Sequence, residues 1–227
     1  MPPFCPQHRA AVRAALACVL LAGTLAAQQS EESRERWQRV PDVFAALGVA
    51  PGARVADVGA GGGFFTARLA RAVESDGRVF AVDVDADMIQ RLQQRAAREQ
   101  WSNVEIIHSA PDDPRLPAGS LDAALVMNAY HEFAEEEAMV RGLARALKPG
   151  GRLVIVDQVP QAGRLRDGRP AQERAHELGS WFAVRDLLVA GFGIVRLEDP
   201  FIVREGTGAE DDWWLLVAVR AAEPAGR

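Results

Sequence analysis

Asp57, Gly59, Gly61 and Gly63 alternate along the stretch DVGAGGG, which directly follows a short apolar run. Glycine has no side chain and adopts backbone conformations that other residues avoid, so a loop of this composition lets a ligand approach the backbone closely. After the first strand of an open parallel sheet, such a loop lies where nucleotide cofactors bind. The spacing therefore predicts a cofactor site at residues 57–63. The alternative is a tight turn needed only for helix packing.

Asp83 is the second residue whose position indicates a cofactor. It ends an apolar run 20 residues beyond Gly63, where an acid in nucleotide-binding α/β folds accepts hydrogen bonds from ribose hydroxyls. The alternative role, capping the next helix, suits Asp85 better. A dinucleotide fingerprint requires a third glycine at position 64, and Phe64 stands there, which disfavours a nicotinamide cofactor.

Tyr130, His131 and Glu132 follow another apolar run and are the candidate catalytic residues. An imidazole titrates near neutral pH, so His131 is the best candidate for a general base, with Glu132 or Tyr130 to orient it. The alternative is that these residues cap a helix beginning near Glu135. His176 can reach the same cleft, although we expect a partly buried, hydrogen-bonded histidine there.

The elements that must position these residues alternate in type along the chain. Short apolar runs suited to buried strands alternate with segments of helical spacing, which predicts a mostly parallel sheet covered by helices. The runs are RVADVG, GRVFAVDVD, NVEIIHS, LDAALVMN and GRLVIVD, and the helical segments between them are GFFTARLARAV, ADMIQRLQQRAAREQ and EEEAMVRGLARALK. Residues 160–170 form a predicted loop, residues 174–191 a helical segment, and the runs at 193–199 and 213–220 a C-terminal pair of strands.

The first 27 residues have the layout of a secretory signal peptide. Arg9 and Arg13 precede an uncharged run that ends in small residues at Ala26 and Ala27. A retained membrane anchor is the alternative. Both cysteines, Cys5 and Cys18, lie in this leader, so the mature chain has no thiol or disulfide chemistry. The predicted organisation is a signal peptide at 1–27, a helical lead-in at 28–50, one domain at 51–221 and a tail at 222–227.

Charge and histidine spacing narrow the function further. Without the leader, 24 basic and 31 acidic side chains remain, a net charge of −7 that disfavours nucleic acid as a partner. His108, His131 and His176 lack close ligand spacing, so no metal site is predicted. We expect no stable membrane insertion once the leader is removed.

The glycine loop and Asp83, taken with two later stretches, resemble the class I methyltransferases that use S-adenosylmethionine. The later stretches are DDPRLPAGSLDAALVMNAYHEF and LARALKPGGRLVIVDQ, and the resemblance extends over residues 40–221. It implies a Rossmann-like α/β sandwich with a mostly parallel sheet of about seven strands and a C-terminal antiparallel hairpin.

The resemblance also implies roles for individual residues. The methionine portion of S-adenosylmethionine is expected near the glycine loop with Ala60, and its ammonium group near Asp57. Asp83 is expected at the ribose, Val84 and Met88 at the adenine, and Asn128 beside the sulfonium. The adenine amino group is often met by an acid after the third strand, but Ala110 stands at that position, which leaves Asp112 or Asp113.

The function that the resemblance implies is methyl transfer to a small-molecule substrate, and the predicted signal peptide implies that the protein acts outside the cytoplasm. The cofactor is made inside cells, which conflicts with export and leaves an exported, non-catalytic binding protein as one alternative. A nicotinamide-dependent oxidoreductase is the other. No motif in the sequence identifies the methyl acceptor or the oligomeric state.

Overall fold

The computed structural model describes residues 30–204 and 212–221, so the predicted leader lies outside the described residues. The chain divides into two units, residues 1–40 and 41–227. In the first unit, residues 30–37 are helical, and Arg34 donates a hydrogen bond to the Gln38 side chain. No helix among the described residues has both the length and the apolar character needed to cross a bilayer.

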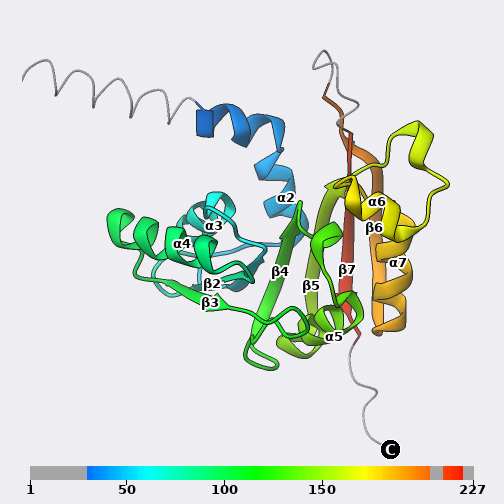
Figure 1. Cartoon of the computed structure of the whole chain (residues 1–227). Helices are drawn as coiled ribbons and strands as arrows, with labels where there is room; N and C mark the ends of the chain where they lie inside the picture. The colour runs from blue at the N-terminus through cyan, green and yellow to red at the C-terminus, as the bar shows by residue number, and fades with distance from the viewer. Residues whose placement is uncertain (1–29, 205–211, 222–227) are drawn as a thin grey trace, which may run out of the picture. The chain divides into compact units, whose positions relative to one another are not determined.

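The second unit is built on one seven-stranded sheet, whose strand order is β3-β2-β1-β4-β5-β7-β6 (Figure 1). Neighbouring strands from β3 to β5 are parallel, and β7 pairs antiparallel with β5 on one side and β6 on the other. The bounds are β1 Arg54–Val58, β2 Arg78–Asp83, β3 Val104–His108, β4 Leu121–Met127, β5 Leu147–Gln158, β6 Phe192–Ile202 and β7 Trp213–Arg220. The predicted fold class is confirmed, including the C-terminal antiparallel pair.

Helices cover both faces of the sheet because β1, β2, β4 and much of β5 are apolar on both sides. Successive residues of β2 show the division: Phe80 and Val82 join the core formed with α5 and α7, whereas Ala81 packs with Ile89 and Leu92 of α4. The helices are α2 Val40–Leu47, α3 Phe64–Val73, α4 Ala86–Glu99, α5 Glu136–Ala146, α6 Arg169–Arg174 and α7 Ser180–Val189, with two 3-10 turns, η1 Tyr130–Glu132 and η2 Ala162–Arg164.

The segment that connects β5 to α7 is held to the sheet by a buried tryptophan. The side chain of Trp214 in β7 is fully buried, and its indole nitrogen donates a hydrogen bond to the carbonyl of Leu178 at 2.6 Å. The segment predicted as helical over 174–191 contains the last residue of α6, a turn and then α7, and the predicted loop at 160–170 contains η2 and the start of α6. That turn carries His176, which has a positive φ of 57°.

Candidate functional site

Strand order reverses between β1 and β4, and this is where open α/β sheets bind ligands. The glycine loop leaves β1 at this point and lies against the segment that leaves β4. A Cβ added at Gly59 would stand 2.4 Å from the Cβ of Ala129. Gly59 also has a φ of 73°, so both conformation and space require glycine there.

The middle of the glycine loop faces open space, unlike its two ends. A Cβ added at Gly63 would meet Leu92 at 2.9 Å, whereas one at Gly61 or Gly62 would meet nothing within 4 Å. The loop therefore has glycine at its ends for close packing, and uncovered backbone between them. This uncovered backbone fits the close approach of a ligand that the sequence predicts.

Asp83 holds the glycine loop in place. One carboxylate oxygen accepts a hydrogen bond from the Gly61 amide at 2.8 Å, and the other accepts one from the Asp85 amide at 3.0 Å. Each carboxylate oxygen has capacity for a further hydrogen bond, so contact with a ribose is compatible with both. Asp85, not Asp83, caps α4, since its side chain accepts from the amides of Asp87 and Met88.

The residues predicted around the adenine lie beyond Asp83 and after β3. Val84 is 53% exposed and Met88 is half-buried, which makes an apolar surface next to Asp83. Asp112 and Asp113 are both exposed. The carboxylate of Asp113 accepts a hydrogen bond from the Arg115 amide at 2.9 Å and thereby stabilises its own turn.

Two of the predicted cofactor residues have distinctive local environments. Asp57 is only 2% exposed, and its carboxylate accepts a hydrogen bond from the Thr66 hydroxyl at 2.6 Å, which connects β1 to α3. Asn128 is exposed and has a φ of 56°, a left-handed conformation that asparagine tolerates better than most residues. It directs the chain from β4 into η1.

Tyr130 is placed differently from the sequence prediction. Its ring is fully buried, and its hydroxyl donates a hydrogen bond to the Asp186 carboxylate in α7 at 2.9 Å instead of orienting His131. Burial raises the pKa of the Tyr130 hydroxyl, and the nearby negative charge of Asp186 raises it further. Arg169 also donates to the same carboxylate oxygen. The geometry therefore makes Tyr130 part of a buried structural network.

His131 is oriented by Asp157, a residue that sequence reasoning did not select. Asp157 is fully buried at the end of β5, and its carboxylate contacts both the His131 Nδ1 at 2.8 Å and the His131 amide at 3.0 Å. Burial by itself lowers the pKa of His131, but the hydrogen bond with Asp157 and its charge outweigh that effect, and the pKa is raised. The feature of the sequence that could have identified Asp157 is its position, since it is an acid near the end of a buried strand.

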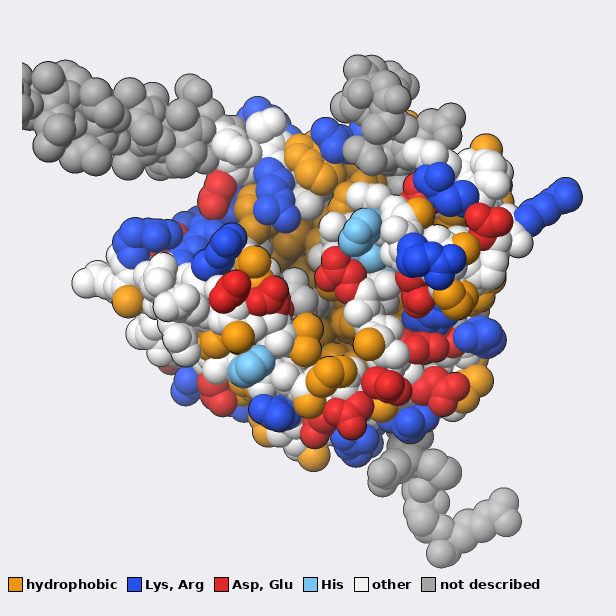
Figure 2. Space-filling model, viewed as in Figure 1, with side chains coloured by type: hydrophobic (Ala, Val, Ile, Leu, Met, Phe, Trp, Pro, Cys, Tyr) orange, Lys and Arg blue, Asp and Glu red, His pale blue; other side chains and the backbone are white. Residues whose placement is uncertain are grey.

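The second nitrogen of His131 faces two further side chains. Its Nε2 lies 3.7 Å from Glu132 and 3.4 Å from the Nδ1 of His176. His176 thus reaches the site, as predicted, but its side chain is 72% exposed, which corrects the expectation of a partly buried histidine. Figure 2 shows a hollow in this face of the molecule, with hydrophobic side chains on its floor and a histidine beside an acidic side chain at one edge.

The chain has recognisable relatives. Residues 55–151 match a family model described as a methyltransferase domain. A ubiquinone/menaquinone biosynthesis C-methyltransferase of Hahella chejuensis is 27% identical over 111 residues, which are 48% of this chain and 45% of the relative. An arsenite methyltransferase of Halobacterium salinarum is 35% identical over 124 residues, 54% of this chain and 31% of the relative. The chain therefore spans less than half the length of either curated relative.

Solved structures share the fold over most of their length. A methyltransferase of Aquifex aeolicus that depends on S-adenosylmethionine is 25% identical, with a TM-score of 0.65, over 80% of this chain and 89% of that chain. The [4+2]-cyclase SpnF is 20% identical, with a TM-score of 0.67, over 82% of this chain and 81% of that one. The second likeness concerns the fold alone.

Proposed function

We propose, on the premise that this chain carries a class I S-adenosylmethionine-dependent methyltransferase domain, that it transfers the methyl group of S-adenosylmethionine to a small molecule. One observation carries the proposal. The glycine loop leaves open space over Gly61 and Gly62 at the point where strand order reverses, and the carboxylate that binds this loop, Asp83, belongs to the neighbouring strand.

The residues of the chain contribute mainly by positioning. S-adenosylmethionine supplies an activated methyl group, whose bond to sulfur breaks as the acceptor atom forms its new bond to carbon. The protein then has to align the acceptor and exclude water. An acceptor oxygen or nitrogen that carries a proton must also lose it. The Nε2 of His131 is the group available for that proton, because Asp157 occupies the Nδ1 side of the ring.

One of the two curated relatives is named as a C-methyltransferase of ubiquinone/menaquinone biosynthesis, and the other as an arsenite methyltransferase. Arsenic(III) is a soft acceptor that favours thiolate ligands. The only cysteines of this chain are Cys5 and Cys18, both within the predicted leader. An acceptor held by oxygen and nitrogen groups therefore suits this chain better than arsenite does.

We also propose that residues 1–27 direct export, so that the enzyme acts in the periplasm or outside the cell. The support is the order of Arg9 and Arg13, the uncharged run and the small residues at its end. N-terminal sequencing of the protein isolated from its native compartment tests this proposal. A product that starts at Gln28 is expected, and a cytoplasmic product with an intact leader contradicts it.

Calorimetry with S-adenosylhomocysteine, S-adenosylmethionine and NAD tests the function. We expect the two adenosyl compounds to bind and NAD not to bind. Tight NAD binding with no signal from S-adenosylhomocysteine would overturn the proposal in favour of an oxidoreductase. A screen of small molecules for S-adenosylhomocysteine release then tests catalysis. Cofactor binding without turnover of any acceptor class supports the non-catalytic alternative.

A further inference from the structure

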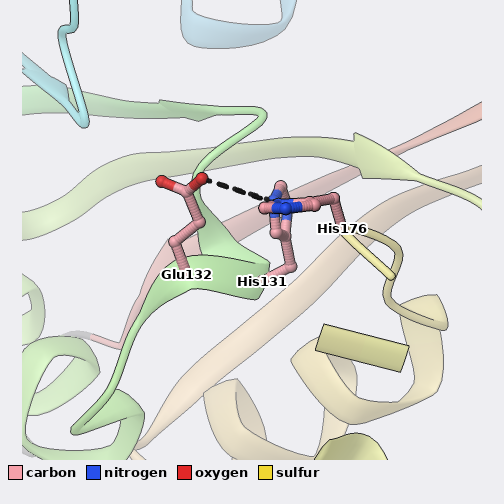
Figure 3. A group of neighbouring side chains, drawn as sticks. All are labelled: His131, Glu132 and His176. Carbon is pink, nitrogen blue, oxygen red and sulfur yellow. Dashed lines mark hydrogen bonds and ion pairs between the residues drawn. The ribbon is translucent and has the colours of Figure 1, made fainter. Parts of the chain in front are cut away.

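Three potential metal ligands converge beside the proposed methyl-transfer site. His131 and Glu132 come from η1 after β4, and His176 comes from the turn after α6, 45 residues further along the chain. Figure 3 shows both imidazoles and the carboxylate turned toward one another. Sequence spacing gave no indication of a metal site, because the pairing of His131 with His176 exists only in the folded chain.

The three ligand atoms have the spacing of a zinc site. His131 Nε2, Glu132 Oε1 and His176 Nδ1 are separated by 3.4, 3.7 and 3.9 Å. Ligand atoms of tetrahedral zinc stand roughly 3.4 Å apart, given Zn–N and Zn–O lengths of about 2.0 to 2.2 Å. The nearest point equidistant from the three atoms lies in their plane, about 2.1 Å from each, and an ion displaced slightly from that plane toward a fourth ligand stays at about 2.2 Å, within the bonding range of zinc.

Asp157 prepares His131 for coordination. A metal-binding histidine usually donates its other ring N–H to a carboxylate, which fixes the tautomer and the ring orientation. The contact between the Asp157 carboxylate and the His131 Nδ1, at 2.8 Å, has this arrangement. With the proton on Nδ1, the lone pair of Nε2 faces Glu132 and His176. The buried carboxylate also increases the basicity of the ligand nitrogen.

The burial of the three side chains indicates a site with an open position. The His131 side chain is 2% exposed, whereas those of Glu132 and His176 are 62% and 72% exposed. One ligand is therefore anchored in the core, and the other two lie at the surface. Two histidines, one glutamate and an open fourth position form a donor set of catalytic zinc sites, in contrast to structural sites, which are closed.

We propose that His131, Glu132 and His176 bind a divalent transition metal ion, with zinc as the first candidate, and that the open coordination position takes an oxygen of the methyl acceptor. The binding site rests on geometry alone, and only the role toward the acceptor rests on the proposed function. A metal ion bound to the His131 Nε2 takes the place of the proton-accepting role described above for that nitrogen, because its lone pair is then used. A bound cation lowers the pKa of a coordinated hydroxyl, so an acceptor hydroxyl there loses its proton to solvent near neutral pH. The acceptor class is then a hydroxylated small molecule that enters as its oxyanion.

Titration of the tag-free full-length chain with Zn²⁺, followed by calorimetry, tests the site, and Co²⁺ supplies a visible spectrum that reports tetrahedral coordination. We expect one ion per chain. His176→Ala should weaken binding by more than about 100-fold, because it removes an exposed ligand with little effect on the core. His108→Ala is the matched control, since His108 is an exposed histidine outside the cluster, and it should bind zinc like the wild type.

Two results would overturn the site: no stoichiometric Zn²⁺ binding by the wild type, or equal binding by His176→Ala and the wild type. Either result would reduce the cluster to hydrogen bonds and ion pairs among His131, Glu132 and His176. Asp157→Asn gives a second measurement, with binding expected to weaken about 10- to 100-fold if the variant is folded by circular dichroism.

Calorimetry with S-adenosylhomocysteine on the same samples separates this proposal from the proposed function. Intact S-adenosylhomocysteine binding without metal binding contradicts the metal site alone. Metal binding without S-adenosylhomocysteine binding contradicts methyl transfer and leaves the site standing.

Discussion

Replacing Tyr130 by Phe distinguishes a catalytic residue from a structural one. The hydroxyl of Tyr130 donates a hydrogen bond at 2.9 Å to the Asp186 carboxylate, in a part of the core where both side chains are buried. The substitution removes this hydroxyl and keeps the ring, which packs against Phe133 with a centroid separation of 5.3 Å. No cavity larger than one oxygen atom results. We therefore expect a loss of stability with turnover preserved.

The size of the loss follows from the remaining partners of Asp186. A hydrogen bond to a charged group contributes about 1.5 to 3 kcal/mol. Arg169 and Arg185 still donate to the two oxygens of this carboxylate in the variant, so its charge stays paired. The expected cost is therefore at the lower end, about 1.5 kcal/mol. For a domain of this size that corresponds to a decrease in Tm of roughly 3 to 6 °C.

The assays are thermal unfolding by calorimetry and steady-state turnover at saturating acceptor. Asp186→Asn is the control, because it leaves the buried Arg169 guanidinium with less compensating charge and should cost more stability than Tyr130→Phe does. Turnover of Tyr130→Phe should stay within about twofold of the wild type, since the hydroxyl makes no contact with the proposed methyl-transfer site. A decrease of 100-fold or more with Tm unchanged would refute the structural role and restore Tyr130 as a catalytic residue.

Three further predictions concern the site and its support. His131→Gln should lower turnover by roughly 10² to 10⁴ with S-adenosylhomocysteine affinity nearly unchanged, by kinetics and calorimetry, and a parallel loss of both would place His131 in the cofactor pocket. Asp83→Asn should weaken S-adenosylhomocysteine binding by about 10-fold or more, because Asp83 accepts from the amides of both Gly61 and Asp85, whereas an asparagine side chain has one acceptor oxygen and a donor NH2 group; unchanged affinity contradicts this. Although burial raises the pKa of Glu177, the Arg164 ion pair lowers it below the ordinary 4.5, so Glu177 stabilises the fold above that pH and loses its contribution as pH falls. Glu177→Gln should therefore flatten the acid decline of unfolding free energy in denaturant titrations, and an unaltered decline argues against this role.

The sequence by itself determined the order of the elements and the place of the cofactor loop. Both follow from local patterns. Apolar runs predict strands buried on both faces, and their alternation with helical segments predicts a parallel sheet. The loop position follows because Gly59 and its neighbours come directly after the first strand. The helix cap at Asp85 could also be predicted from the sequence, because a capping side chain binds backbone amides within a few residues of its own position.

Only the tertiary structure decided which polar side chains act together. The Tyr130 hydroxyl meets an acid 56 residues away in α7, and the His131 ring meets Asp157 from the neighbouring strand and His176 from a distant turn. Whether a side chain after β4 faces the core or the cleft depends on the backbone of a three-residue turn, η1, for which hydrophobic periodicity has no signal. Contacts between residues far apart in the chain arise from strand register and helix packing, and this is why the network around Tyr130 and the ligand cluster around His131 emerged only from the folded chain.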